Sequence, residues 1–247
     1  MAAAPVHVPA FVVLSGGPIG TASVRQLLRA VVAGRLATSR IVVVDRDPLC
    51  EASRVQDPRV ELAVADWTAW LDTQADAVGP TAHLVPYHWA PHVLVDWLTV
   101  QVGRAHGSAR RGGDVPTLGT PVDRATRDGD RALSYATWIC PPTCIEPALC
   151  PHTRGPKDWS LAADLAGPTV GVGLHGRLVF RCLHLVWGVG TVPMGDILAA
   201  RDRVVAGMAE GTRRYLVATS SHCHALATIL EVRPSEPVDA VHSGALA

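Results

Sequence analysis

Four short, strongly apolar runs alternate with helical patterns in the first hundred residues, and this alternation limits the folds that the chain can adopt. Strands that are buried on both faces read as continuous apolar runs, and the helices between them cover the two faces of the sheet. Gly34 suits the end of the first helix, whose apolar face consists of Val24, Leu27, Leu28, Val31 and Val32. The sequence therefore predicts an α/β fold with a doubly wound parallel sheet, and its strands lie within residues 8–15, 40–48, 59–67 and 81–87.

A glycine-rich turn follows the first predicted strand and leads into the first helix. It reads Ser15-Gly16-Gly17-Pro18-Ile19-Gly20. Gly17 lies where the backbone could approach a pyrophosphate without a Cβ in the way, and Gly20 allows the helix to pack closely on the strand. The helix N-terminus would offer free N–H groups to phosphates. Asp45 ends the second predicted strand, where a carboxylate can accept hydrogen bonds from a ribose diol.

This turn and Asp45 together resemble the nucleotide-binding half of NAD-dependent dehydrogenases, in the NAD(P)-binding Rossmann superfamily, where G-x-G-P-I-G is a common form of the turn. Ser15 replaces the first glycine of that pattern. The resemblance covers roughly residues 8–100 and implies that NAD, or NADP, contacts Ser15, Gly16, Gly17, Ile19, Gly20, Asp45 and Arg46. The carboxylate favours NAD, while Arg46 leaves NADP open. Class I methyltransferases also have a glycine turn and an acid at these points, so S-adenosylmethionine is an alternative, as is a turn that binds no nucleotide.

Composition changes near residue 131, and we expect two domains. A Rossmann-like nucleotide-binding domain would cover residues 1–131, ending in a Gly-, Arg- and Asp-rich linker over 102–131 with one short strand near 115–118. A smaller α+β domain that contains the Cys and His residues would cover 132–247. Within it, the sequence predicts a strand over 177–190, a helix over 194–208 and one or two strands over 213–232.

Three of the six cysteines fall within eleven residues, in the pattern Cys140-x3-Cys144-x5-Cys150-x-His152. Thiolates and imidazole are ligands of zinc and of iron–sulfur clusters, although this spacing matches neither a zinc ribbon nor a ferredoxin. Cys182 or Cys223 would supply a further thiolate. We expect Cys182 and His184 to share one face of a strand, and His222 and His224 to share another, with Cys223 opposite. The alternative is a proline-stiffened loop with free thiols or a redox pair.

Tyr87 and His88 come where the fourth predicted strand ends, with His92 close behind. Ligands of open α/β sheets bind beyond the carboxyl ends of the strands, so these side chains would face the nicotinamide. His88 has the pKa range of a general acid or base, and Tyr87 lies beside it. Their alternative role is packing at the edge of the sheet.

The formal net charge is zero, so there is no basic excess that would favour nucleic acid or an anionic membrane. No apolar run reaches the length of about 18 residues that a membrane span needs, and the first apolar run lacks the basic flank of a signal peptide. We therefore expect a cytoplasmic protein with a small-molecule substrate, no nucleic-acid or membrane partner, and self-association into a homo-oligomer.

These features favour an NAD(P)-dependent oxidoreductase with a C-terminal metal or iron–sulfur site. Two other classes stay open: a non-catalytic module that senses nucleotide or handles metal, and an S-adenosylmethionine-dependent, methyltransferase-like protein. Neither Tyr-x3-Lys nor G-x-S-x-G is present to specify a reaction.

Overall fold

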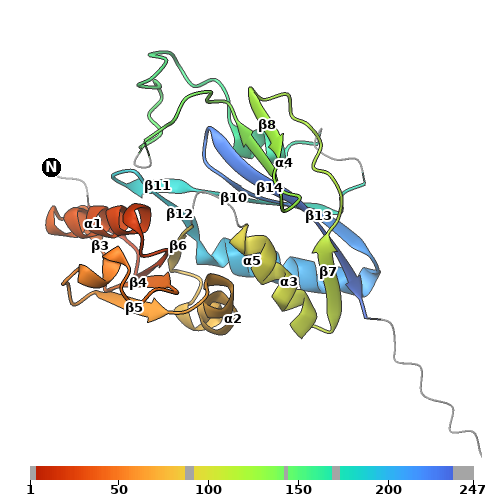
Figure 1. The fold of residues 1–247 in the computed structure, drawn as a ribbon, viewed down its shortest axis with the longest axis horizontal. Helices are drawn as coiled ribbons and strands as arrows, with labels where there is room; N and C mark the ends of the chain where they lie inside the picture. Colours follow the sequence, from red (N-terminus) through yellow and green to blue (C-terminus); the bar gives the residue numbers. More distant parts are fainter. Residues whose placement is uncertain (1–3, 87–91, 142–143, 169–172, 236–247) are drawn as a thin grey trace, which may run out of the picture.

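The computed structural model describes residues 4–86, 92–141, 144–168 and 173–235, and shows a mixed α/β fold (Figure 1). Two six-stranded sheets contain most of the described strands. A short parallel pair lies beside the first sheet and consists of β1 (Val6–His7) and β3 (Leu36–Ala37). Two 3-10 helices, η1 (Glu51–Arg54) and η2 (Met208–Glu210), complete the connections. None of the helices in the described ranges is both long and apolar enough to cross a membrane.

The first sheet has a parallel centre and an antiparallel edge, in the order β11-β12-β6-β2-β4-β5. Its four parallel strands are β2 (Ala10–Leu14), β4 (Arg40–Asp45), β5 (Val60–Val64) and β6 (His83–Val85). They match the four apolar runs of the sequence. The other two strands, β11 (Leu183–Val186) and β12 (Val189–Pro193), come from the second half of the chain and extend the sheet beyond β6.

Helices pack on both faces of this sheet because its side chains alternate in direction. Phe11 and Val13 face one side and pack with Val24 and Leu27 of α1 (Pro18–Val32). Val12 and Leu14 face the other side. Their cluster includes residues of α2 (Trp67–Val78), α3 (Val93–Arg104) and α5 (Met194–Gly207).

The second sheet is mainly antiparallel, in the order β10-β13-β14-β9-β8, with β7 also paired to β14. The strands are β7 (Gly107–Arg111), β8 (Val122–Ala125), β9 (Arg131–Ser134), β10 (Gly176–Arg181), β13 (Arg213–Ser220) and β14 (His224–Pro234). The short helix α4 (Leu161–Ala166) covers one face, where Leu161 and Leu165 pack against Leu216 and Ile229. Both sheets draw strands from both sides of residue 131.

The structure corrects two expectations about the second sheet. Residues 115–118 form no strand; the strands of this stretch are β7 and β8. The predicted strand over 177–190 is three strands, because the chain leaves the second sheet at Cys182 and then turns tightly at Trp187 and Gly188. Both turn residues have positive φ, of 42° and 77°, which is typical of a two-residue hairpin.

Candidate functional site

A cavity of about 750 Å³ lies between the two sheets and is large enough for a small-molecule ligand. Leu14, Ile19 and Pro86 line it from the first sheet, where β2 and β6 end and α1 begins. The second sheet and the irregular segment after β9 supply the opposite wall, with Ser134 and Cys223 among its residues. Figure 1 shows this segment as an irregular green arm near β8. The cavity therefore joins the carboxyl edge of the parallel strands to the cysteine-bearing region.

The glycine turn is held in a defined shape by its own hydrogen bonds. Ser15 adopts a positive φ of 84°, and its Oγ accepts a hydrogen bond from the Gly17 N–H at 3.1 Å. A Cβ on Gly16 would lie 2.2 Å from Cys50 Sγ, and one on Gly20 would lie 1.8 Å from the Ser15 carbonyl oxygen. A Cβ on Gly17 would meet only Ser15 Oγ, at 3.3 Å. The turn is thus tightly packed at Gly16 and Gly20 and open at Gly17.

Asp45 supports this turn directly. Its carboxylate accepts hydrogen bonds from the Gly16 N–H at 2.6 Å and from the Asp47 N–H at 2.9 Å. Each carboxylate oxygen has two lone pairs, so one on each oxygen stays available for a ligand hydroxyl. The Arg46 guanidinium is paired with Asp66, the N-cap residue of α2. Asp45 can serve both the turn and a ligand, whereas Arg46 already has a counter-ion.

Four cysteines line the cavity: Cys140, Cys144, Cys182 and Cys223. Burial raises the pKa of Cys140, and the nearby Cys144, Cys223 and Cys150 raise it further. Cys223 lies in the turn between β13 and β14, and its Sγ accepts a hydrogen bond from Trp159 Nε1 at 3.4 Å. The structure thus brings Cys223 to the predicted cysteine segment across more than seventy residues of sequence.

Cys150 and His152 lie beside the cavity lining rather than in it. Hydrogen bonds from the backbone N–H of Thr153, and then of His152, lower the pKa of the buried Cys150. The His152 ring stacks on Trp138, with ring centroids 4.4 Å apart and planes 9° apart. The backbone N–H groups therefore favour the thiolate form of Cys150, while the His152 ring is engaged in stacking.

Cys182 and His184 lie on the same side, as expected, because both line the cavity and both lie close to Gly190. Residues 221–223 form the turn before β14, so strand alternation does not apply there, and Cys223, which we expected opposite His224, lines the cavity with it. Burial raises the pKa of Cys182 to about 12, with a further contribution from Glu146. A thiol in this environment stays protonated and packs as a small apolar side chain.

Glu146 connects the cysteine segment to two histidines. Its carboxylate accepts a hydrogen bond from the His222 N–H at 2.7 Å and lies 3.8 Å from His184 Nε2. Glu146 has a positive φ of 51°, which is uncommon for this residue type. Burial lowers the pKa of His184, so its imidazole is neutral near pH 7 and can accept a proton. Glu146 and His184 both line the cavity and form a candidate acid–base pair.

Three further polar side chains line the same cavity: the paired Ser134 and His224, and His92. Ser134 Oγ lies 2.9 Å from His224 Nδ1, and both residues line it. His92, at the N-cap of α3, is buried and also lines it. Tyr87 and His88, the candidate catalytic residues of the sequence, lie outside the described residues.

The described His, Cys, Asp and Glu side chains do not come together in groups of three at distances that would hold a metal ion. The cysteines are neighbours rather than a preformed cage. All six cysteines are free. A bound metal would therefore have to draw the sulfur atoms closer together.

Sequence reasoning missed Glu146 and gave no role to Lys157. Glu146 was visible as the single acid within the cysteine- and proline-rich segment, and Lys157 as the only lysine of the chain. The importance of Glu146 depends on its contacts with the β13–β14 turn and with β11, which local sequence does not reveal.

His92 should make the protein sensitive to acid. Burial lowers its pKa to about 4, so the folded state takes up this proton at lower pH than the unfolded state, whose histidine titrates near its ordinary value of about 6.5. The free energy of unfolding should therefore fall as pH drops from 6.5 towards 4. Over this pH range, we expect the His92→Gln variant to lose on the order of 2 kcal/mol less stability than the wild type does. Chemical denaturation at several pH values measures it.

The control for His92 is His7→Gln, since His7 is exposed on β1. This variant should leave the pH dependence of unfolding unchanged. Equal slopes for the wild type and His92→Gln between pH 4 and 6.5 would contradict the prediction.

The fold and its cavity define a mixed α/β protein with a ligand-sized site between two sheets. Residues 93–233 match the AF_1314_C family, described as an uncharacterized protein, C-terminal domain. Since this match covers more than half of the chain, the protein belongs to that family. The matched region runs from the start of α3 into β14 and includes the cysteine segment. Comparisons with the curated proteins and with the solved structures give no match.

Proposed function

We propose that this protein binds NAD(H), or NADP(H), in the cavity and acts as a dinucleotide-dependent oxidoreductase on a small-molecule substrate. One observation carries the proposal: the cavity joins the carboxyl edge of β2 and β6 to a wall of thiols and imidazoles. The parallel strands have the order β5-β4-β2-β6, which is the order 3-2-1-4 of a Rossmann-like, doubly wound sheet. Nucleotides bind at this edge, where the strand order reverses.

The residues present fit a dinucleotide. Gly17 is open on the side where a pyrophosphate would approach, and no side chain caps the N-terminus of α1. Asp45 keeps lone pairs for ribose hydroxyls beyond the two N–H groups that it already accepts. Because Arg46 is paired with Asp66, the arrangement favours NAD over NADP. A cavity of about 750 Å³ leaves room for a substrate beside one end of the nucleotide.

The bound dinucleotide would supply hydride transfer. The chain's own residues would handle the accompanying proton: the neutral His184 imidazole lines the cavity beside Glu146 and would exchange that proton with the substrate. The apolar lining from Leu14, Ile19 and Leu84 would exclude water. Tyr87 and His88 lie outside the described residues and keep the catalytic role that the sequence suggests for them.

A thiolate metal centre in the cavity wall, with zinc or an iron–sulfur cluster, is the second part of the proposal. The support is that Cys140, Cys144 and Cys223 line one cavity. Cys150 is near enough to contribute to the raised pKa of the Cys140 thiol. If the cavity binds nucleotide without turnover, the protein would be a sensor or metal-handling module instead.

Gly17→Val tests nucleotide binding. Gly17 has φ −71° and ψ −172°, which valine adopts readily, so the fold should persist. The branched side chain would occupy the approach of the pyrophosphate, and we expect affinity for NAD(H) to fall at least tenfold. Isothermal titration calorimetry with NADH, NADPH and S-adenosylmethionine measures this, and thermal melting checks the fold.

The matched control is Gly103→Val, because a Cβ at Gly103 on α3 meets nothing within 4 Å. This variant should bind NADH as the wild type does. Binding of S-adenosylmethionine without NADH or NADPH would show that the nucleotide is wrongly assigned, and unchanged NADH affinity in Gly17→Val would rule out the turn as its site.

A further inference from the structure

The described lining of the cavity carries a single formal charge. That charge is the Glu146 carboxylate, and the described lining residues include neither Lys nor Arg. Residues 87–91 and 142–143, which the structure does not describe, contain no Lys or Arg in the sequence either. Much of the remaining lining is apolar, with Leu84, Val93 and Leu133 among its residues. A ligand that leaves water for this cavity therefore meets no cation among the described lining residues.

Arg111 is near the cavity but is not part of its described lining. Its guanidinium pairs with Asp96 at 2.9 Å and with Asp130, whose side chain is fully buried. Burial lowers the pKa of the nearby His92, and the charge of Arg111 lowers it further. The His92 imidazole is therefore neutral near pH 7, and the charge of Arg111 is already offset by two carboxylates.

Lys157 is likewise outside the described lining. Its Nζ is shielded from solvent and makes no hydrogen bond to another described residue. Its charge reaches His184, but the opposite charge of Glu146 acts more strongly on that ring, from a distance of 3.8 Å between the carboxylate and Nε2. Negative charge therefore dominates at this wall of the cavity.

His92 offers the cavity a polar atom that has no partner. The residue is 3 % exposed, and its Nε2 is buried without a hydrogen bond to any other described residue. A neutral imidazole nitrogen either accepts a hydrogen bond from a hydroxyl or donates one to a carbonyl oxygen. Because an unpaired buried nitrogen costs free energy, a ligand whose polar atom pairs with Nε2 gains affinity.

The Ser134–His224 pair offers a second polar atom. Ser134 Oγ has one proton, which it donates to the Ala136 carbonyl at 2.8 Å. The 2.9 Å contact between Ser134 and His224 is then completed by the Nδ1–H of His224, and this tautomer leaves Nε2 as an acceptor. Burial lowers the pKa of His224, so the ring is neutral near pH 7. His224 can thus accept a hydrogen bond from a ligand hydroxyl without presenting a charge to it.

We propose that the substrate of this cavity is an uncharged alcohol or carbonyl compound with an apolar body, and that His92 Nε2 binds its polar group. The inference rests on the proposed function and names its substrate class, since hydride transfer interconverts alcohols and carbonyl compounds. The alcohol loses a hydride to the oxidised dinucleotide and its hydroxyl proton to the neutral His184, so atoms and charges balance. A carboxylate or phosphate would enter without a counter-ion and beside Glu146.

The experiment titrates the full chain with hexanamide, hexanoate and hexylammonium. The amide stands in for the carbonyl group of a substrate, while the other two carry a negative or a positive charge near pH 7. Binding is followed by NMR of isotope-labelled imidazole nitrogens, with and without NADH. We expect hexanamide to shift the signals of the cavity histidines. It should bind at least tenfold more tightly than hexanoate and no more weakly than hexylammonium.

Two variants locate the effect. Glu146→Gln keeps an acceptor for the His222 N–H but removes the charge, so the advantage of hexanamide over hexanoate should shrink at least threefold. His92→Phe keeps a ring but removes its nitrogens, and affinity for hexanamide should fall about tenfold. The matched control is His222→Phe, because the His222 Nε2 is also buried and unpaired but the residue does not line the cavity. This control should bind hexanamide as the wild type does.

Thermal melting checks the fold of each variant. If His92→Phe does not fold, the ratio of hexanamide to hexanoate affinity in the wild type and in Glu146→Gln decides the substrate class. An unchanged affinity for hexanamide in folded His92→Phe would show that His92 does not bind the polar group.

The remaining outcomes separate this inference from the proposed function. Equal or tighter binding of hexanoate would refute the substrate class, and its loss in Lys157→Met would show that Lys157 forms an anion site instead. Tighter binding of hexylammonium, or no binding of any of these ligands to folded wild type, would refute the class as well. NADH affinity, measured on the same samples, reports on the nucleotide site alone. Hexanamide binding without NADH or NADPH binding would end the proposed oxidoreductase and leave the ligand class in place.

Discussion

Arg111→Met is expected to lower the free energy of unfolding by about 3–5 kcal/mol, because it leaves a buried carboxylate without its cation. Arg111 on β7 pairs with Asp130, whose side chain is fully buried, and with Asp96 on α3 at 2.9 Å. Thr228 on β14 also donates to Asp130. The arginine therefore connects a helix to the second sheet beside the cavity. Urea denaturation, followed by circular dichroism, measures the loss.

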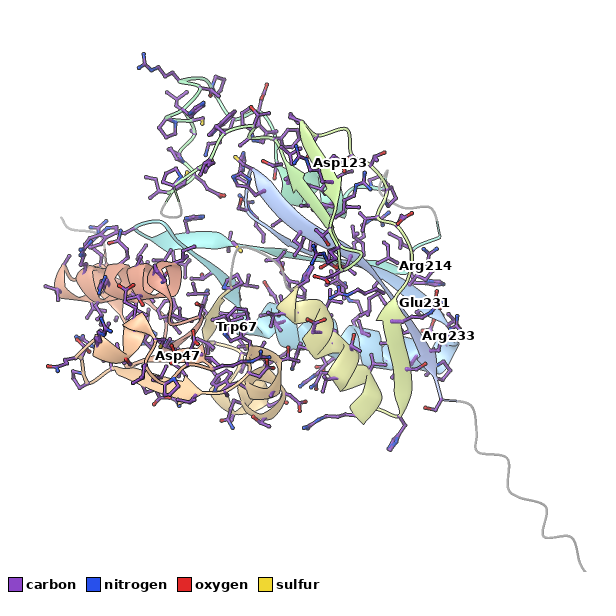
Figure 2. All side chains as sticks on the ribbon, viewed as in Figure 1. Asp47, Trp67, Asp123, Arg214, Glu231 and Arg233 are labelled. Carbon is purple, nitrogen blue, oxygen red and sulfur yellow. The ribbon has the colours of Figure 1, made fainter. Side chains whose placement is uncertain are left out.

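The neighbouring arginine provides the control. Arg110 pairs with Glu231, which Figure 2 labels beside Arg233 near the end of β14, and the Arg110 side chain is 65 % exposed. Arg110→Met should cost no more than about 1 kcal/mol, since the Arg110 side chain is largely solvated and Arg233 still pairs with Glu231. Adding Asp130→Asn to Arg111→Met should recover part of the loss. Similar losses for the two single arginine variants would show that burial of Asp130 does not determine the effect.

Gly20→Ala is expected to destabilise the protein by about 3 kcal/mol or more, at or beyond the usual cost of overpacking. The new Cβ would lie 1.8 Å from the Ser15 carbonyl oxygen, and a backbone atom cannot yield as a flexible side chain can. The start of α1 would have to move away from β2, so nucleotide affinity should fall with stability. Thermal melting and NADH titration measure the two effects.

Gly103→Ala has the opposite expected sign. Gly103 lies within α3 with open space around it, and alanine favours a helix over glycine by about 0.5–1 kcal/mol. The melting temperature of this variant should rise slightly. If Gly20→Ala were as stable as the wild type, the close approach of α1 to β2 would be wrong.

The sequence predicted the parallel strands well because each is a local apolar run. β2, β4, β5 and β6 fall within the expected ranges, as does the helix α5. Prediction from the sequence failed for strands whose conformation depends on pairing with a distant strand. β7 reads Gly-Ser-Ala-Arg-Arg and has no apolar pattern, so its pairing with β14 decides its conformation. The apolar stretch around Cys182 reads as one strand, although tertiary pairing divides it between two sheets.

The residues of the candidate site were largely visible in the sequence, but their grouping was not. Gly17, Asp45 and Cys140 stand in recognisable local patterns. The meeting of Cys223 with the cysteine segment depends on the packing of the β13–β14 turn against a loop more than seventy residues earlier. A single sequence has no local signal for such a contact, which is why the fourth metal ligand stayed open between His152, Cys182 and Cys223.

The pairing of β12 with β6 has a consequence for how the protein is made. Val192 pairs with Leu84, and His83 Nδ1 lies 2.9 Å from Thr191 Oγ1, a partner 108 residues later. A nascent chain on the ribosome therefore carries an open β6 edge until this late segment emerges. An open edge is a template for pairing with other chains. Synthesis thus passes through a long interval in which the N-terminal sheet is aggregation-prone, and the interval ends when β12 covers the β6 edge.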